Sequence, residues 1–251
     1  MIITSSHNQA CPRLFPARGI FLRAGRNGFA EISFGMKDPM HRTWWFNLNI
    51  LSLVVITALL FSTLSVTPVT AAPGDTTRVS VASDGTQGIG YSQYPSISAD
   101  GRYVAFHSPA MNLVTGDMNG FTDVFVHDRT TGATTLLSVA SDGTQGTGES
   151  MYPSISADGR YVAFHSDASS LVTGDTNSRH DIFVHDRITG ITTRVSVASD
   201  GTQGNNYSSD LSISADGRYV VFQSAASNLV SGDTNSADDV FVHDLTTGTT
   251  T

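Results

Sequence analysis

Three loops of the chain repeat one acidic spacing that could bind a metal ion. Asp or Asn stands at positions 1, 3 and 7 of each loop: Asp117, Asn119 and Asp123; Asp175, Asn177 and Asp181; Asp233, Asn235 and Asp239. Such oxygens can converge on Ca²⁺, which takes roughly six to eight hard ligands. The loops lack the acidic residue at position 5 and the glutamate at position 12 of EF-hand loops. Because Asp and Asn also cap turns with their own side chains, a calcium site and a purely structural turn both remain open.

Histidines form a second recurring set. His127, His185 and His243 occupy equivalent positions, as do His107 and His165, while His180 is irregular. Three equivalent histidines could ring a channel and bind a transition metal. Strand alternation places His127 on the same side as Phe125, which favours packing or a hydrogen bond instead.

No residue pattern indicates catalysis or nucleic-acid binding. Ser150 lacks the second glycine of a nucleophile elbow, and no glycine-rich phosphate loop precedes a helix. From residue 72 onward the chain has eight basic and 20 acidic residues, a formal charge of −12, and no lysine. Clustered cations are what bind phosphates, so we expect no nucleic-acid partner. We expect no enzyme activity and no required cofactor.

The N-terminal residues read as an export signal. Residues 48–66 are apolar, follow Arg42 and precede the small residues Ala71 and Ala72, so 40–72 is expected to be a signal peptide, or an uncleaved anchor as the alternative. Residues 1–39 are long for its basic start and are interpreted as an extension before the true initiation site. Either signal places the body outside the cytoplasm, with membrane contact only through an uncleaved segment. The single cysteine, Cys11, precedes the body, which therefore cannot form disulfides or thiolate sites.

The body, 77–251, is a tandem repeat with a period of 58 residues. Its units are 77–134, 135–192 and 193–250, each containing Ser-Asp-Gly-Thr-Gln-Gly, Ser-Ala-Asp-Gly-Arg-Tyr and Phe-Val-His-Asp at fixed spacing. Period-two alternation predicts strands at 78–83, 96–98, 102–108 and 123–128, and Thr131-Gly132 turns the chain into 134–140, the first strand of the next unit. The dipeptide Asp100-Gly101 predicts a type I′ hairpin turn. Four short strands per unit are typical of one propeller blade.

These repeats resemble a known family. YPSISADGRYVAFHS followed by DVFVHDRTTG is similar to the TolB-like, or WD40-like (PD40), β-propeller repeat of bacteria. The resemblance covers essentially all of 77–251, although Ser-Ala-Asp-Gly replaces Ser-Pro-Asp-Gly and Leu211 replaces a proline. It implies an all-β fold of propeller blades in an envelope or secreted protein, or a propeller attached to a hydrolase, and implies no shared catalytic residue.

Three blades are few for a ring, since propellers close with about four to eight. The chain is therefore expected to be a fragment of a longer one, an open three-blade array, or half of a six-bladed ring formed by a homodimer. Its end inside a turn favours the first, and the strand at 78–83 could complete the last blade.

Two functions from different classes follow from these features. The first is an exported, non-enzymatic scaffold that binds a protein, peptide or glycan. The alternative is the accessory propeller of a secreted hydrolase whose catalytic domain lies beyond residue 251.

Overall fold

The computed structural model describes residues 22–24, 30–32 and 74–251. The first two segments form a small hairpin in which β1 (Leu22–Ala24) pairs antiparallel with β2 (Ala30–Ile32). The remainder of the predicted extension 1–39, including Cys11, and the predicted signal segment 40–72 lie outside the described residues. In the part of the chain that is described, no helix is long and apolar enough to cross a membrane.

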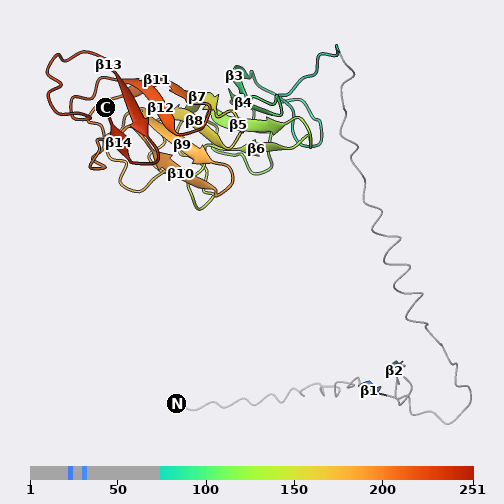
Figure 1. Cartoon of the computed structure of the whole chain (residues 1–251). Helices are drawn as coiled ribbons and strands as arrows, with labels where there is room; N and C mark the ends of the chain where they lie inside the picture. Colours follow the sequence, from blue (N-terminus) through green and yellow to red (C-terminus); the bar gives the residue numbers. More distant parts are fainter. Residues whose placement is uncertain (1–21, 25–29, 33–73) are drawn as a thin grey trace, which may run out of the picture. The chain divides into compact units, whose positions relative to one another are not determined.

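Residues 74–251 contain three antiparallel sheets of four strands each, side by side in chain order (Figure 1). The first holds β3 (Gln93–Ile97), β4 (Tyr103–Ser108), β5 (Asp123–Asp128) and β6 (Thr134–Leu136). The second holds β7 (Ser150–Ile155), β8 (Tyr161–Ser166), β9 (Asp181–Asp186) and β10 (Ile191–Arg194). The third holds β11 (Ser208–Ile213), β12 (Tyr219–Ser224), β13 (Asp239–Asp244) and β14 (Thr249–Thr250). This repetition of meanders confirms the all-β fold of three blades, a partial propeller.

Alternating side chains pack the blades against each other. We call the side of a blade that meets the following blade its outgoing face, and the opposite side its incoming face. Val124 and Val126 on the first outgoing face share a core with Val162 and Phe164 on the second incoming face. Ile182 repeats the contact against the third blade. In the second blade, which has a neighbour on each side, period-two alternation thus gives β8 and β9 two buried faces.

The first strand of each blade lies on the inner side of the array, because β3 contacts β7 and β7 contacts β11. A backbone series links these inner edges: Ala99 N–H donates to Ala157 O, and Ala157 N–H donates to Ala215 O, each at 2.9 Å. Residues on the inner strands therefore face the region that corresponds to a propeller axis.

Two of the predicted strands are wrong. The strand expected at 78–83 is reduced to one bridge, Val81 to Gln87, because the hydroxyl groups of Ser83 and Thr134 hold this segment to β6 in place of a ladder. It therefore stays on the first blade and does not complete the last, whose fourth strand is β14. Likewise, residues 134–136 close their own sheet instead of opening the next one.

The Asp-Gly turn also differs from the prediction. Gly101 has a φ of 70°, whereas Asp100 is not among the residues with positive φ. Gly101 N–H donates to Ser98 O, so a turn of type I geometry precedes a left-handed glycine, and Ser98 N–H donates to Tyr103 O to close the hairpin loop. The Asp100 carboxylate stabilises it by accepting from Ser98 Oγ and Arg102 N–H.

Candidate functional site

The repeated acidic loop precedes the third strand of each blade. In the first blade, Asp117 Oδ1 and Asp123 Oδ2 both accept from Nε2 of Gln145, at 2.8 and 3.0 Å. Asp123 Oδ1 accepts from Ser138 Oγ at 2.5 Å. Both carboxylates are buried. The structure therefore brings the first and seventh positions of the loop together around an amide from the following unit.

The third position contributes a side-chain hydrogen bond that lowers the pKa of Asp123, and it also caps the turn. Asn119 Oδ1 accepts from Phe121 N–H at 2.9 Å, and its Nδ2 donates to Gly146 O at 3.0 Å. Asn177 repeats both contacts in the second blade. These asparagines thus act as turn caps that tie the loop to the next unit, as the structural interpretation expects.

The charge around the carboxylates differs between blades. In the second blade, Arg194 Nη1 lies 3.5 Å from Asp175 Oδ1 and 3.8 Å from Asp181 Oδ2. Leu136 occupies the equivalent position in the first blade. There, Oδ2 of Asp117 is buried without a hydrogen-bond partner among the described residues. Burial raises the pKa of Asp123 to about 6, and the charge of Asp117 adds to the rise.

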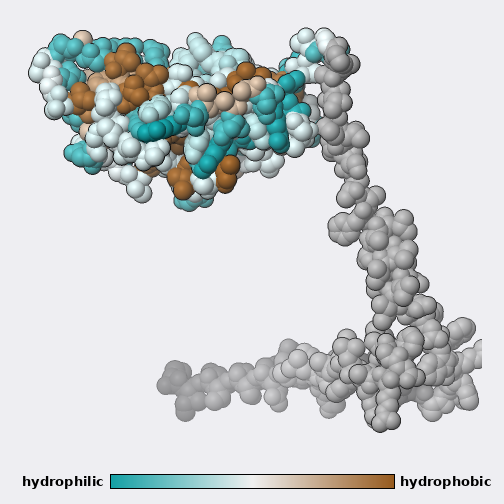
Figure 2. All heavy atoms as spheres, in the orientation of Figure 1, coloured by the Kyte–Doolittle hydropathy of each residue, from teal (hydrophilic) through white to brown (hydrophobic). Residues whose placement is uncertain are grey.

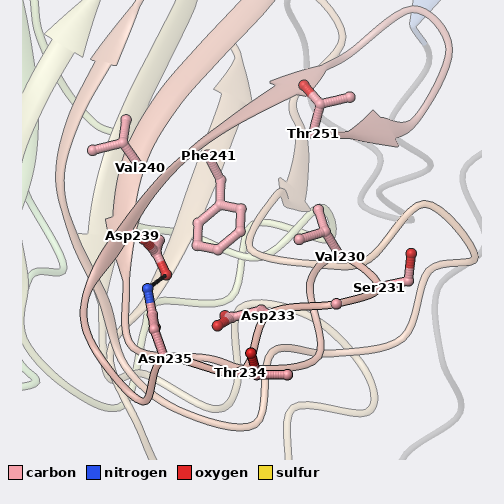
Figure 3. Close-up of a pocket in the computed structure, with 10 residues that line it drawn as sticks. Val230, Ser231, Asp233, Thr234, Asn235, Asp239, Val240, Phe241 and Thr251 are labelled. Carbon is pink, nitrogen blue, oxygen red and sulfur yellow. Dashed lines mark hydrogen bonds between the residues drawn. The ribbon is translucent and has the colours of Figure 1, made fainter.

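The third loop lies in a pocket of about 390 Å³. Asp233, Asn235 and Asp239 line it with Val240 and Phe241 (Figure 3). Here Asn235 Nδ2 donates to Asp239 Oδ2 at 3.0 Å. No cluster of three or more His, Cys, Asp or Glu suited to a metal is found among the described residues. Calcium at the loops stays a prediction.

A second group of side chains lies on and beside the inner strands β3 and β7; its histidines were named from the sequence, whereas its tyrosines and the contact among the rings were not. We call it the axial row: the rings of Tyr94, His107, Tyr152, His165 and His180. Tyr94 stacks on His107 with centroids 5.3 Å apart and meets Tyr152 edge-on at 4.4 Å. Tyr152 meets His165 at 4.8 Å, and His165 stacks on His180 at 5.0 Å. The five rings form one continuous aromatic contact across two blades.

Backbone strain accompanies the row. Tyr94, Tyr152 and Asp210, at equivalent positions, have φ values of 50°, 53° and 46°. Each lies at a register shift between the first and second strand of its blade. Non-glycine residues in this region are uncommon and strained, and they persist where the surroundings hold them. The tyrosines remain 55% and 37% exposed, so the strain presents aromatic surface to solvent.

The row is asymmetric between the blades. In the third blade Asp210, Gln223 and Asp238 replace Tyr, His and His. Tyr207 Oη donates to Asp238 Oδ1 at 2.8 Å, and Gln223 Nε2 donates to Asp238 Oδ2 at 2.8 Å. One end of the inner side is therefore aromatic and the other is acidic. The signal that marks these residues in the sequence is their difference from the equivalent positions of the second unit.

The recurring histidines of the third strands do not face the inner side. Nδ1 of His127 lies 2.8 Å from Thr134 Oγ1, and His185 and His243 repeat this contact with Thr192 and Thr250. Each histidine bonds within its own blade, as strand alternation predicted.

Neither a known protein-family profile nor a curated protein sequence matches the chain. Similar solved structures are TolB from Acinetobacter baumannii (20% identity, 66% of this chain and 32% of that one, TM-score 0.39) and the β-propeller domain of the Trilobed protease from Pyrococcus furiosus (13%, 64% and 41%, 0.40). Dipeptidyl peptidase 4 from Porphyromonas gingivalis is a third (17%, 66% and 19%, 0.42). The chain spans less than half the length of each. At these identities the likeness to TolB and other PD40-type propellers concerns the fold alone.

Proposed function

We propose that the body is an exported, non-enzymatic propeller scaffold that binds a protein, peptide or glycan through the axial row. The observation that carries the proposal is the exposed pair Tyr94 and Tyr152, held at strained positive φ beside stacked histidines. Exposed aromatic rings supply large contact area at low conformational cost, which is why they dominate binding sites. The neighbouring Asp210 and Asp238 offer acceptors for hydroxyl or amino groups of such a ligand. A chain recovered only from the cytoplasm would contradict export.

The double substitution of Tyr94 and Tyr152 by Ala tests the role of the row. With the full chain as probe on glycan and peptide arrays, we expect the bound spots to weaken at least about tenfold, the size of effect seen when binding hot spots are truncated. Ile188→Ala is the control, because Ile188 is 75% exposed and lies in the turn after β9. Equal binding by the double variant and the wild type would contradict the proposal. A catalytic domain in the same reading frame beyond residue 251 would instead favour an accessory propeller of a hydrolase.

We also propose that Ca²⁺ binds at the first acidic loop alone. The support is Asp117, whose buried Oδ2 lacks a hydrogen-bond partner within the described residues, in a loop where Leu136 stands in place of the cation Arg194. Two buried carboxylates without a counter-charge are unfavourable, so a hard cation would stabilise them. In the second blade the guanidinium already supplies this charge.

Exchanging the two residues tests the calcium proposal. After chelation, calorimetric titration of the wild type should detect one Ca²⁺ per chain, with a Kd on the order of 0.1–1 mM as in extracellular modules. We expect Leu136→Arg to remove this site and Arg194→Leu to add a second one. Leu136→Gln, which adds no charge, should keep the first. Absence of heat and of any rise in Tm with the wild type would refute calcium binding, as would unchanged binding by Leu136→Arg.

A further inference from the structure

Each of the first two blades is completed by a glutamine from the following unit. Gln145 reaches into the acidic loop of the first blade, and Gln203 donates to Asp175 and Asp181 of the second at 2.9 and 3.0 Å. Both glutamines belong to the Ser-Asp-Gly-Thr-Gln-Gly turn that opens a unit. Contact between blades thus includes a repeated amide-to-carboxylate bridge.

The first unit carries the same turn with its glutamine unused. Residues 83–88 have the identical sequence, and Thr134 Oγ1 donates to Val81 O just as Thr192 Oγ1 donates to Val139 O. The segment is therefore held on its own blade in the same way. The Gln87 side chain is exposed and has no hydrogen-bond partner among the described residues. Its position is equivalent to that from which Gln145 and Gln203 reach the preceding blade.

The third blade has the complementary vacancy. Its acidic loop lines the pocket of Figure 3, where no glutamine among the described residues bridges Asp233 and Asp239. The outgoing face beside it is also open: Val240 is 71% exposed, whereas the equivalent Val124 and Ile182 are fully buried. Figure 2 shows apolar surface at this end of the body, where β13 lies. Nothing in the described part of the chain covers it.

The incoming edge of the first blade shows the matching exposure. Ile97 is 57% exposed, whereas its equivalents Ile155 and Ile213 are 7% and 8% exposed because a preceding blade covers them. In addition, Ile155 N–H and Ile213 N–H each donate to a serine hydroxyl of the preceding blade, Ser96 and Ser154. The two open ends thus carry the two halves of one contact that the chain already makes twice.

We infer that a second copy of the chain docks head-to-tail on this face, with its first blade against the third blade of the first copy. Gln87 of the second copy enters the pocket and bridges Asp233 and Asp239, while its Ile97 covers the apolar surface around Val240. The same contact joins the first blade of the first copy to the third blade of the second copy. Two copies thus close a ring of six blades, and closed propellers have about four to eight blades. The acidic site of the third blade is complete only in the assembly. This inference is independent of the ligand bound by the axial row.

Light scattering coupled to size exclusion tests the inference on the full chain. We expect a dimer for the wild type and monomers for both Val240→Glu and Ile97→Glu, with unchanged circular dichroism. An equimolar mixture of the two variants should recover dimers, because one intact outgoing face then meets one intact incoming edge. Ile188→Glu, at an equally exposed turn residue, is the matched control and should remain dimeric.

Three results would overturn the inference. The first is a wild-type monomer at concentrations up to on the order of 100 μM, well above the dissociation constants of specific interfaces. The second is a dimer that Ile97→Glu leaves intact while Val240→Glu dissociates it, since this pattern means that two outgoing faces pack together. The third is a ladder of larger oligomers, which is the product of a head-to-tail contact that does not close.

Discussion

Gly159→Ala is expected to destabilise the chain by about 3 kcal/mol, which for a domain of this size lowers the Tm by roughly 10 °C. Gly159 has a φ of 72°, and a Cβ atom there would lie 2.2 Å from Cδ2 of Tyr103 in the preceding blade. Left-handed backbone costs alanine about 1 kcal/mol. Displacing a packed ring adds roughly 1–3 kcal/mol. The ring cannot retreat easily, because the Arg187 guanidinium lies 4.0 Å from its centroid on the same packed surface.

Gly190→Ala separates the two costs. Gly190 has a φ of 74° with open space around its Cα, so this variant should lose only about 1 kcal/mol. In a Tyr103→Ala background the cost of Gly159→Ala should fall to the same value, since the clashing ring is gone. Chemical unfolding at equilibrium measures the free energy of unfolding of the wild type, of the three single variants and of the double variant Tyr103→Ala/Gly159→Ala. Equal losses for Gly159→Ala and Gly190→Ala would show that the contact between blades does not constrain this glycine.

The architecture could be predicted from the sequence because the same strand pattern occurs in all three units. The strand at 123–128 was located to the residue, since Val124, Phe125 and Val126 alternate between two apolar faces and aspartates end the run. Recurrence at 58 residues then carried the result to β9 and β13.

Segments shaped by side chains were harder to predict. The alternation of Val79 and Val81 resembles a strand. However, the backbone N–H and C=O of Thr134 bond to the hydroxyl of Ser83 and not to the backbone of this segment, so no ladder forms. Similarly, Asp100 holds its own turn through its carboxylate, which removes the need for a second positive φ. Periodicity records apolar faces and carries no information on such bonds.

For the candidate sites, too, the residue types could be predicted from the sequence but their contacts could not. The acidic loops were visible as a shared motif, but their partner Gln145 lies in the next unit and was not connected to them. The histidines of the axial row were visible in the sequence, but their contact with Tyr94 and Tyr152 was not, because the positive φ that the two tyrosines share leaves no mark in the residue pattern. Only the fold brings these inner-strand residues into one line of contact.

His165→Gln is expected to reduce the loss of stability in mild acid. His165 is 7% exposed, and both ring nitrogens lack partners among the described residues. Burial lowers its pKa from 6.5 to about 4, and the nearby His180 and His107 add to the shift. His165 therefore binds a proton near pH 6.5 in the unfolded chain but only near pH 4 in the folded chain. Above pH 6.5 the protonation of His165 does not reduce the free energy of unfolding. As the pH decreases below 6.5 this free energy falls, by roughly 3 kcal/mol at about pH 4.

Glutamine is the substitution that the chain itself uses, at Gln223 of the third blade. Because it does not titrate, the free energy of unfolding of the variant should vary less than that of the wild type between about pH 6.5 and pH 4. The difference between the two curves isolates His165 from Asp123, whose raised pKa acts with the opposite sign: its proton binds the folded state first, so acid stabilises it from about pH 6 downward. Any constant cost of burying an amide is removed by normalising both curves at pH 8. Parallel curves would mean that His165 takes up its proton in the folded chain as readily as in the unfolded one, and hence that the axial row opens to water.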